Sequence, residues 1–265
     1  MEGRLQEVFT VNAFTASPFA GNPASVCLLE LELSEEQLQG VAAQMNHSET
    51  AFVTRLDTGA AFQTADTFQL RWFTPTTEVQ LCGHATLAAA AVLFKAVENQ
   101  QPKLTFITRW GLHLTARRDG DRIELELPLN DRQLSAATGK LLLRLADSCT
   151  VQQLEALKPD VGQLTRLHDG GEVRGVIVTV RGGGQFHCQS RYFAPWVGIP
   201  EDPVTGSAHT VLGPYWARQL GVERLSARQC SPRGGQLAVA VDWAAGRTRV
   251  AGEAVIVLRG QLRVA

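Results

Sequence analysis

The stretch FTPTTEVQLCGHATLAAAAVLF, residues 73–94, has a counterpart in FAPWVGIPEDPVTGSAHTVLGPYW, residues 193–216. Both open with Phe-x-Pro after a run that carries an Arg and an aromatic residue. Both then reach an acid, a loop and a small-residue step, which is Gly-His-Ala in one and Gly-Ser-Ala in the other. Both continue as an apolar segment of helical length. The same order of features, found twice about half a chain apart, predicts a duplicated unit. The alternative is a chance recurrence of strand, turn and helix.

The apolar segment of the first copy, ATLAAAAVLF (85–94), is apolar on all sides, so we expect it to be buried on all sides. A helix wrapped by its own mostly antiparallel strands meets that condition. We therefore predict an α+β fold of two similar barrels, each around a central helix and related by a pseudo-twofold axis, with a ligand cleft between them. The first barrel is predicted at residues 1–117, with a tail at about 259–265 returning to it, and the second at residues 118–258.

The remaining patterns predict further strands and helices along the chain. A helix is expected at 34–45, where Ser34 and Gln37 have the spacing of a capping box. Further helices are expected at 139–148 and 148–159. Runs with strand composition lie at 7–14, 24–30, 49–56, 67–73, 103–110, 122–128, 175–181, 185–193, 236–243 and 247–264.

Composition limits the classes of protein that fit the chain. Hydrophobic residues make up 45% of the 265 residues and charged residues 19%, as in an ordinary soluble globular protein. The 25 basic and 26 acidic residues form no single-sign block, so neither nucleic acid nor an anionic membrane is expected as a partner. No signal peptide is expected, and the longest apolar run is too short to span a bilayer.

The cysteines favour a reducing compartment. There are five, at positions 27, 82, 149, 188 and 230, and they include no C-x-x-C pair. An odd number of widely spaced cysteines is typical of reduced thiols in a cytoplasmic protein and not of a disulfide framework or a zinc site.

The two Gly steps are candidate binding loops. Gly83 and Gly206 each precede a predicted helix, whose free N–H groups and dipole favour an anion. His84 and Ser207 follow directly and can each donate a hydrogen bond, so we predict a small carboxylate-bearing ligand. The alternative is an ordinary helix cap.

Acidic residues supply the candidate acid/base groups. Pro203 favours extended geometry at Asp202, and one of Glu201 and Asp202 is expected to point inward and the other to be solvated. Glu49 begins a predicted strand, where partial desolvation would raise its pKa and make it a general base. The alternatives are two solvated acids and a surface Glu49.

Other reactive side chains receive simpler interpretations. Cys82 precedes a predicted helix start, which would lower the pKa of its thiol. Three histidines near apolar positions are expected to be structural: His113, His187 and His209. The chain contains no Walker loop, H-E-x-x-H or G-x-S-x-G motif.

Four segments together resemble the PhzF family of phenazine biosynthesis, namely GNPASVCLL (21–29), MNHSETAFV (45–53) and the regions 71–94 and 190–216. The resemblance covers nearly the whole chain and is weakest at 128–172, which looks shortened. It implies a diaminopimelate-epimerase-like fold, a homodimer, and a site between the two barrels. It also implies isomerisation of a dihydro-hydroxyanthranilate by proton transfer between ring carbons, with no cofactor and no metal.

The resemblance also implies roles for single residues. Glu49 is the matching catalytic acid/base and Asp202 the assisting acid. His84 and Ser207 match substrate-binding residues, and Gly83 and Gly206 match backbone contacts. Ser48 and Cys82 join the substrate-binding set as neighbours.

Two positions depart from what related proteins carry. Related epimerases use one cysteine on each loop. Cys82 matches the first, but Asp202 stands at the second, which makes a two-thiol mechanism doubtful. Many members of the family have an acid where this chain has Gln80.

These observations predict a cofactor-independent isomerase or epimerase that moves a proton on carbon of a small carboxylate. The alternative, from a different class, is a non-catalytic metabolite-binding or protein-interaction module on the same fold, because a fold does not fix a function.

Overall fold

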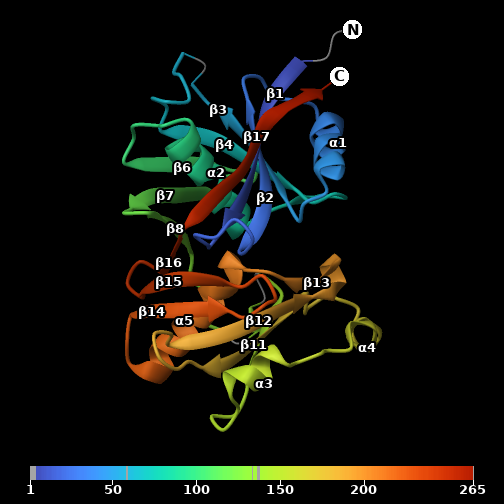
Figure 1. The fold of residues 1–265 in the computed structure, drawn as a ribbon, viewed down its shortest axis with the longest axis vertical. Helices are drawn as coiled ribbons and strands as arrows, with labels where there is room; N and C mark the ends of the chain where they lie inside the picture. The colour runs from blue at the N-terminus through green and yellow to red at the C-terminus, as the bar shows by residue number, and fades with distance from the viewer. Residues whose placement is uncertain (1–3, 58, 133, 136–137, 265) are drawn as a thin grey trace. The chain divides into compact units, whose positions relative to one another are not determined.

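The computed structural model describes residues 4–57, 59–132, 134–135 and 138–264. The chain divides into two compact units (Figure 1). Unit 1 comprises Met1–Glu126 and Gly252–Ala265, and unit 2 comprises Leu127–Ala251. Within the described residues, no helix has both the length and the apolar character that a membrane crossing requires.

Unit 1 wraps mostly antiparallel strands around one buried helix. Strand β1 pairs antiparallel with β2 and β17, β2 runs parallel to β3, and β4 runs parallel to β6. Helix α2 contacts β1, β2, β3 and β17, and every one of its residues is buried, as predicted for the Ala-rich segment. The elements are β1 (Arg4–Ala13), β2 (Asn22–Leu29), α1 (Glu35–Met45), β3 (Thr50–Arg55), β4 (Thr67–Phe73), β5 (Glu78–Val79), α2 (Gly83–Ala91), the π-helical turn η1 (Val92–Ala96), β6 (Lys103–Ile107), β7 (His113–Asp119), β8 (Arg122–Pro128) and β17 (Ala254–Val264).

Helix α1 covers the outer face of this strand layer. It begins with the predicted capping box, in which Ser34 and Gln37 each bond the other's backbone. Leu38 and Val41 of α1 join one core cluster with Cys27 and Phe52 of the strands. The outer face of unit 1 is therefore closed by an amphipathic helix.

Unit 2 repeats the pairing order of unit 1. Strand β10 runs parallel to β11, β11 is antiparallel to β12, and β12 runs parallel to β14, as β2, β3, β4 and β6 do in unit 1. Helix α5 contacts β10, β14 and β15. The elements are β9 (Leu134–Ser135), β10 (Lys140–Arg144), α3 (Val151–Glu155), α4 (Val161–Leu167), β11 (Gly175–Arg181), β12 (Cys188–Ala194), the 3₁₀ turn η2 (Pro195–Val197), β13 (Ile199–Asp202), α5 (Gly206–Leu220), β14 (Arg224–Gln229), β15 (Gly235–Asp242) and β16 (Arg247–Gly252).

A matched ion pair marks the duplication at the level of side chains. Arg71 donates from Nε and Nη2 to Glu78 at 2.8 Å each. Arg191 donates from the same two nitrogens to Glu201 at 2.7 and 2.8 Å. Each Arg also lies over the Phe two residues later. The predicted α+β fold of two similar units is therefore confirmed.

The predicted unit boundaries differ from the observed ones. Residue 117 lies within β7, whose pairing with β6 and β8 keeps it in unit 1. The return to unit 1 comes at Gly252 and not near residue 259. Of the predicted tail, residue 265 lies outside the described residues. The single predicted strand at 247–264 is two strands, β16 and β17.

One predicted helix is wrong. Residues 139–148 contain the strand β10, which pairs in parallel with β11. Leu142 is buried, whereas Leu141 and Leu143 point to the other side of the strand and are less buried. The predicted helix at 148–159 is limited to α3. Helix α4 and strand β14 were not predicted.

Candidate active site

Glu49 lies in the short connection between α1 and β3, directly before β3 begins. Helix α1 ends at Asn46, which has the left-handed φ of 52° that turns the chain back. The backbone oxygen of Glu49 then accepts a hydrogen bond from the Ser25 N–H of β2 at 3.1 Å. Beside it, the Ser25 hydroxyl lies 2.7 Å from His47 Nδ1. The position of Glu49 is therefore fixed by β2 before β3 begins.

His84 lies in the first turn of α2 and links three predicted site residues. Its Nε2 lies 3.2 Å from Glu49 Oε2 and 3.3 Å from Ser48 Oγ. On the other side of the ring, Nδ1 lies 3.4 Å from Cys82 Sγ. Glu49, Cys82 and His84 are 8%, 6% and 4% exposed. The structure thus brings half-buried Ser48 and buried Glu49, Cys82 and His84 into one cluster, which we call the His84 cluster.

The predicted raised pKa of Glu49 is wrong. Burial alone raises the pKa of this carboxyl, but the positive charge of His84 and the polar contacts with His84, Ser48 and Cys82 outweigh it and hold the pKa below its ordinary value. The prediction from the sequence included the effect of burial but not the positive charge of His84, which lies far from Glu49 in the sequence. Glu49 is therefore a carboxylate at neutral pH.

His84 shows the opposite shift. Burial lowers the pKa of its imidazole, but the negative charge of the Glu49 carboxylate and the polar contacts with Cys82 and Glu49 raise it well above the ordinary value. His84 is therefore an imidazolium that faces a carboxylate.

The predicted lowered pKa of Cys82 is also wrong. Burial and the nearby charge of Glu49 raise the pKa of this thiol, and His84 lowers it by less. The dipole at the start of α2 does not overcome complete burial. Cys82 is therefore a neutral thiol at physiological pH.

The His84 cluster holds three types of metal-ligating atom. A carboxylate oxygen, a thiol sulfur and a ring nitrogen lie within 4.8 Å of one another. However, the imidazole stands between the other two groups and faces Cys82 with Nδ1 and Glu49 with Nε2. Since a histidine binds one ion through one nitrogen, this geometry fits a proton relay better than a metal site.

Asp202 is the inward acid of the pair in unit 2. It is 4% exposed, and its Oδ2 accepts a short hydrogen bond from the Thr205 hydroxyl. Glu201 is not solvated as expected, because it forms the bidentate pair with Arg191. Buried Gln229 completes the arrangement: its Nε2 donates to the Asp202 backbone oxygen at 2.7 Å, and its Oε1 accepts from the Thr205 N–H at 2.9 Å.

The start of α5 resembles that of α2. Gly206 and Gly83 are the first residues of the two helices, and neither N-cap side chain makes a capping bond. Ser207 is half-buried, and its hydroxyl bonds to none of the residues that the structure describes. His209 is structural as expected: its Nδ1 donates to the Thr205 oxygen at 2.8 Å, and burial lowers its pKa to about 4.

Two residues of the Asp202 site were missed by sequence reasoning. Thr205, and not Asp202 as expected, occupies the repeat position of Cys82: both are N-cap residues directly before the Gly, so the duplication carried a signal for Thr205. Gln229 lies on β14, far along the chain, and nothing local marks it. Gln80, the departure noted above, is exposed and nothing in the structure explains it. That the Asp202 site and the His84 cluster serve one ligand stays a prediction.

Comparisons with known proteins agree with these features. The sequence profile described as phenazine biosynthesis-like protein (PhzC-PhzF) matches residues 11–133 and again residues 125–260, once for each half. The chain is 47% identical over 284 residues to phenazine biosynthesis-like domain-containing protein 1 of Mus musculus, covering 96% of this chain and 98% of the mouse protein. It is 42% identical over 271 residues to an uncharacterized isomerase of Pseudomonas aeruginosa, covering 97% and 98% of the two chains.

A solved structure supports the same assignment. The crystal structure of a PhzF family phenazine biosynthesis protein from Enterococcus faecalis matches with a TM-score of 0.86 at 34% identity, covering 98% of this chain and 100% of that one. The predicted diaminopimelate-epimerase-like fold is confirmed by this similarity.

Proposed function

Because the chain belongs to the phenazine biosynthesis-like (PhzC-PhzF) family, we propose that it is an isomerase or epimerase that moves a proton on carbon of a small carboxylate without a cofactor. The observation that carries the proposal is the buried ion pair of Glu49 and His84, a carboxylate beside an imidazolium. The similarity to a Pseudomonas aeruginosa protein that is called an isomerase supports the same reaction class.

Glu49 is the proposed base. Its Oε2 lies close to His84 but accepts no aligned hydrogen bond from any described residue, so a lone pair is left for a substrate proton. The proton would pass from a substrate carbon to Glu49 while the C–H electron pair moves toward the adjacent carbonyl or carboxyl group. Return of the proton to another carbon, or to the other face, completes the reaction with no net oxidation.

His84 is the proposed stabiliser of the intermediate. When the C–H bond breaks, negative charge develops on a substrate oxygen, and a fixed cation in a buried site stabilises that charge. Ser48 lies 3.3 Å from the same ring nitrogen and would help orient the imidazole. Cys82 contacts the other ring nitrogen and would keep the ring in place as a neutral thiol.

Asp202 is the proposed second acid/base group. Thr205 and Gln229 hold its carboxylate and backbone in one orientation. The Ser207 hydroxyl, which bonds to no residue that the structure describes, and the N–H groups at the start of α5 would bind polar oxygens of the substrate. Gly206 and Gly83 permit close approach to the backbone there.

Proton exchange with solvent tests this proposal directly. The protein would be incubated in D₂O with a panel of small amino acids and unsaturated carboxylic acids, and NMR would record deuterium at carbon. We expect uptake with at least one acid, lost in Glu49→Gln and kept in the control Glu36→Gln, an exposed glutamate of α1. Uptake that survives Glu49→Gln would contradict the role of Glu49. Saturable binding of a panel acid without uptake would favour the non-catalytic alternative.

A further inference from the structure

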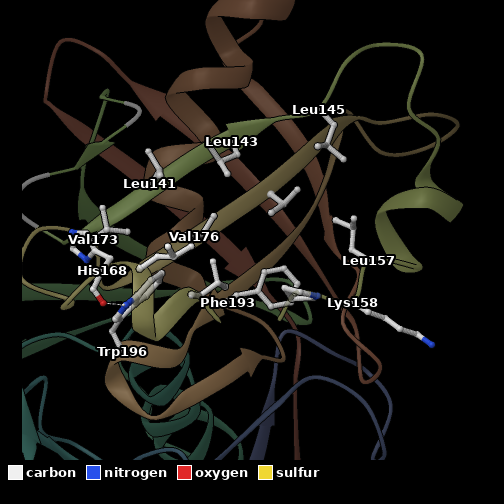
Figure 2. A pocket seen from close by; sticks show the side chains of 14 residues that line it. Leu141, Leu143, Leu145, Leu157, Lys158, His168, Val173, Val176, Phe193 and Trp196 are labelled. Atoms are coloured by element: carbon white, nitrogen blue, oxygen red, sulfur yellow. Dashed lines mark hydrogen bonds between the residues drawn. The ribbon is translucent and has the colours of Figure 1, made fainter. Parts of the chain in front are cut away.

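Unit 2 carries an apolar pocket that is not part of the Asp202 site. Its volume is about 520 Å³, within the range of ligand pockets. Figure 2 shows that Leu141 and Leu143 of β10 line it together with Val176 of β11 and Phe193 of β12, while Trp196 closes one end. The lining comes from one face of the strand layer and from the chain around α3 and α4.

The duplication shows why this pocket exists. Thr50 of β3 pairs with Phe73, and Val176 of β11 pairs with Phe193, so the two registers correspond. By this correspondence Leu143 of unit 2 stands where Cys27 stands in unit 1. Cys27 is buried under α1, whereas Leu143 is 45% exposed.

The helices over this face in unit 2 are shorter than α1 and bury fewer side chains. Helix α1 contributes three buried residues to unit 1. Helix α3 buries only Leu154, and α4 buries none of its residues. Leu167 at the end of α4 is 76% exposed at the pocket rim. This hydrophobic face of unit 2 is therefore partly uncovered, whereas α1 covers the corresponding face of unit 1.

The charges at the pocket point to one kind of occupant. Only Lys158 and His168 among the lining residues have ionisable side chains, and no acid lines the pocket. Figure 2 shows His168 near Trp196 at one end and Lys158 at the other, with the Lys158 nitrogen directed away from the pocket. Within the described residues Lys158 has no ion-pair partner.

We propose that this pocket binds a free amphiphilic monocarboxylate, with its apolar chain along Leu143, Val176 and Phe193 and its carboxylate at the solvent end beside Lys158. The apolar walls supply the affinity, because each buried methylene is favourable. Lys158 supplies selectivity for a negative head group, and its exposure limits the strength of that contact. The site is separate from the acid/base groups of the proposed isomerase.

Titration with fatty acids of different length tests the apolar part. Octanoate, decanoate and dodecanoate would be titrated into the full-length protein by calorimetry, with Trp196 fluorescence as a second signal. We expect saturable binding that tightens about fourfold for each added methylene. Glu49→Gln should bind equally well, which separates this site from the proposed catalysis. No saturable binding would overturn the proposal.

Variants test where the acid binds and why. Leu143→Asp and Leu167→Asp change exposed side chains, so folding should be retained, and dodecanoate binding should weaken about tenfold or more because each places a charge in the apolar wall. Leu258→Asp, at an exposed leucine of β17 in unit 1, is the matched control and should bind normally. Binding that survives both pocket variants would overturn the proposal.

The head group has its own control. Lys158→Met keeps the apolar stem and should weaken dodecanoate binding about two- to fivefold, with little effect on dodecanol. Equal affinity for the acid and the alcohol in the unmodified protein would overturn the assignment to a carboxylate. Analytical sedimentation tests whether a second copy of the chain covers the pocket instead. A dimer that is dissociated by Leu143→Asp but not by dodecanoate would also overturn the proposal.

Discussion

At the scale of single residues, the ion pair of Glu49 and His84 is the most informative feature. Burial disfavours the charged form of each group, and the charge of each favours the charged form of the other. The motif resemblance identified both residues from the sequence. It could not give the sign of the Glu49 shift, because that sign depends on a 3.2 Å contact between segments far apart in the chain.

Removal of one partner should expose this dependence. His84→Gln leaves the Glu49 carboxylate buried without its cation, so we expect the free energy of unfolding to fall by about 3–5 kcal/mol in urea denaturation. The double variant Glu49→Gln/His84→Gln removes both charges, and its loss should be smaller than the sum of the single losses. Glu36→Gln serves as the control, with a change within about 0.5 kcal/mol. Simple additivity would refute the ion pair.

The same pair predicts how stability depends on pH. The lowered pKa of Glu49 gives stability that is present above its ordinary value of 4.5 and is lost as pH falls through the folded value. The raised pKa of His84 gives stability that is complete below its ordinary value of 6.5 and is lost as pH rises through the folded value. The stability difference between the protein and the double variant should therefore be largest between these limits. A difference that keeps growing above pH 6.5 would contradict this assignment.

At the scale of elements, α1 and α2 could be predicted from the sequence, whereas the strand β10 was mistaken for a helix. The capping box at Ser34 predicted the start of α1, and the apolar run predicted α2. Residues 139–148 were read as a helix because a short apolar run does not distinguish a helix from a buried parallel strand. Only its parallel pairing with β11 shows that this run is a strand. That partner begins at Gly175, after the connecting residues 145–174, so it lies outside any local sequence window.

Replacement of two helical glycines by alanine should change the free energy of unfolding in opposite directions. A Cβ at Gly213 of α5 would lie 2.7 Å from Val239 Cγ1 on β15, so Gly213→Ala should destabilise the protein by about 1–3 kcal/mol. A Cβ at exposed Gly40 of α1 would meet nothing within 4 Å, so Gly40→Ala should stabilise it by about 1 kcal/mol. Urea denaturation of both variants measures the difference. Stabilisation by Gly213→Ala would mean that α5 packs less closely on β15.

At the scale of the whole molecule, the duplication explains most of what could be predicted. Two matching stretches predicted two similar units, and the pairing order and the two bidentate Arg–Glu pairs agree. The boundaries could not be predicted, because 247–264 reads as one continuous strand run in the sequence. Only the pairing of β17 with β1 assigns its second half to unit 1.

This pairing predicts the effect of a truncation. Deletion of residues 254–264 removes the whole ladder between β17 and β1, so residues 4–126 should lose protease resistance while cleavage within 127–251 lags behind. Limited proteolysis with mass spectrometry would locate the cuts. Arg259→Ala, which removes an exposed ion pair with Glu7 and a cation–π contact with Phe9, should change stability by no more than about 2 kcal/mol. Equal protection of residues 4–126 after truncation would show that β17 is dispensable.

The place of β17 in the chain also sets the order in which the protein can be completed on the ribosome. Translation delivers β1 early, but its partner β17 emerges only after all of residues 127–251. Until then one edge of β1 has no partner from unit 1, and an open strand edge can pair with other chains. Unit 2 is continuous and can finish first, so the half of the protein that is begun first is finished last. The nascent chain is therefore most exposed to chaperones, and to wrong partners, throughout the synthesis of unit 2.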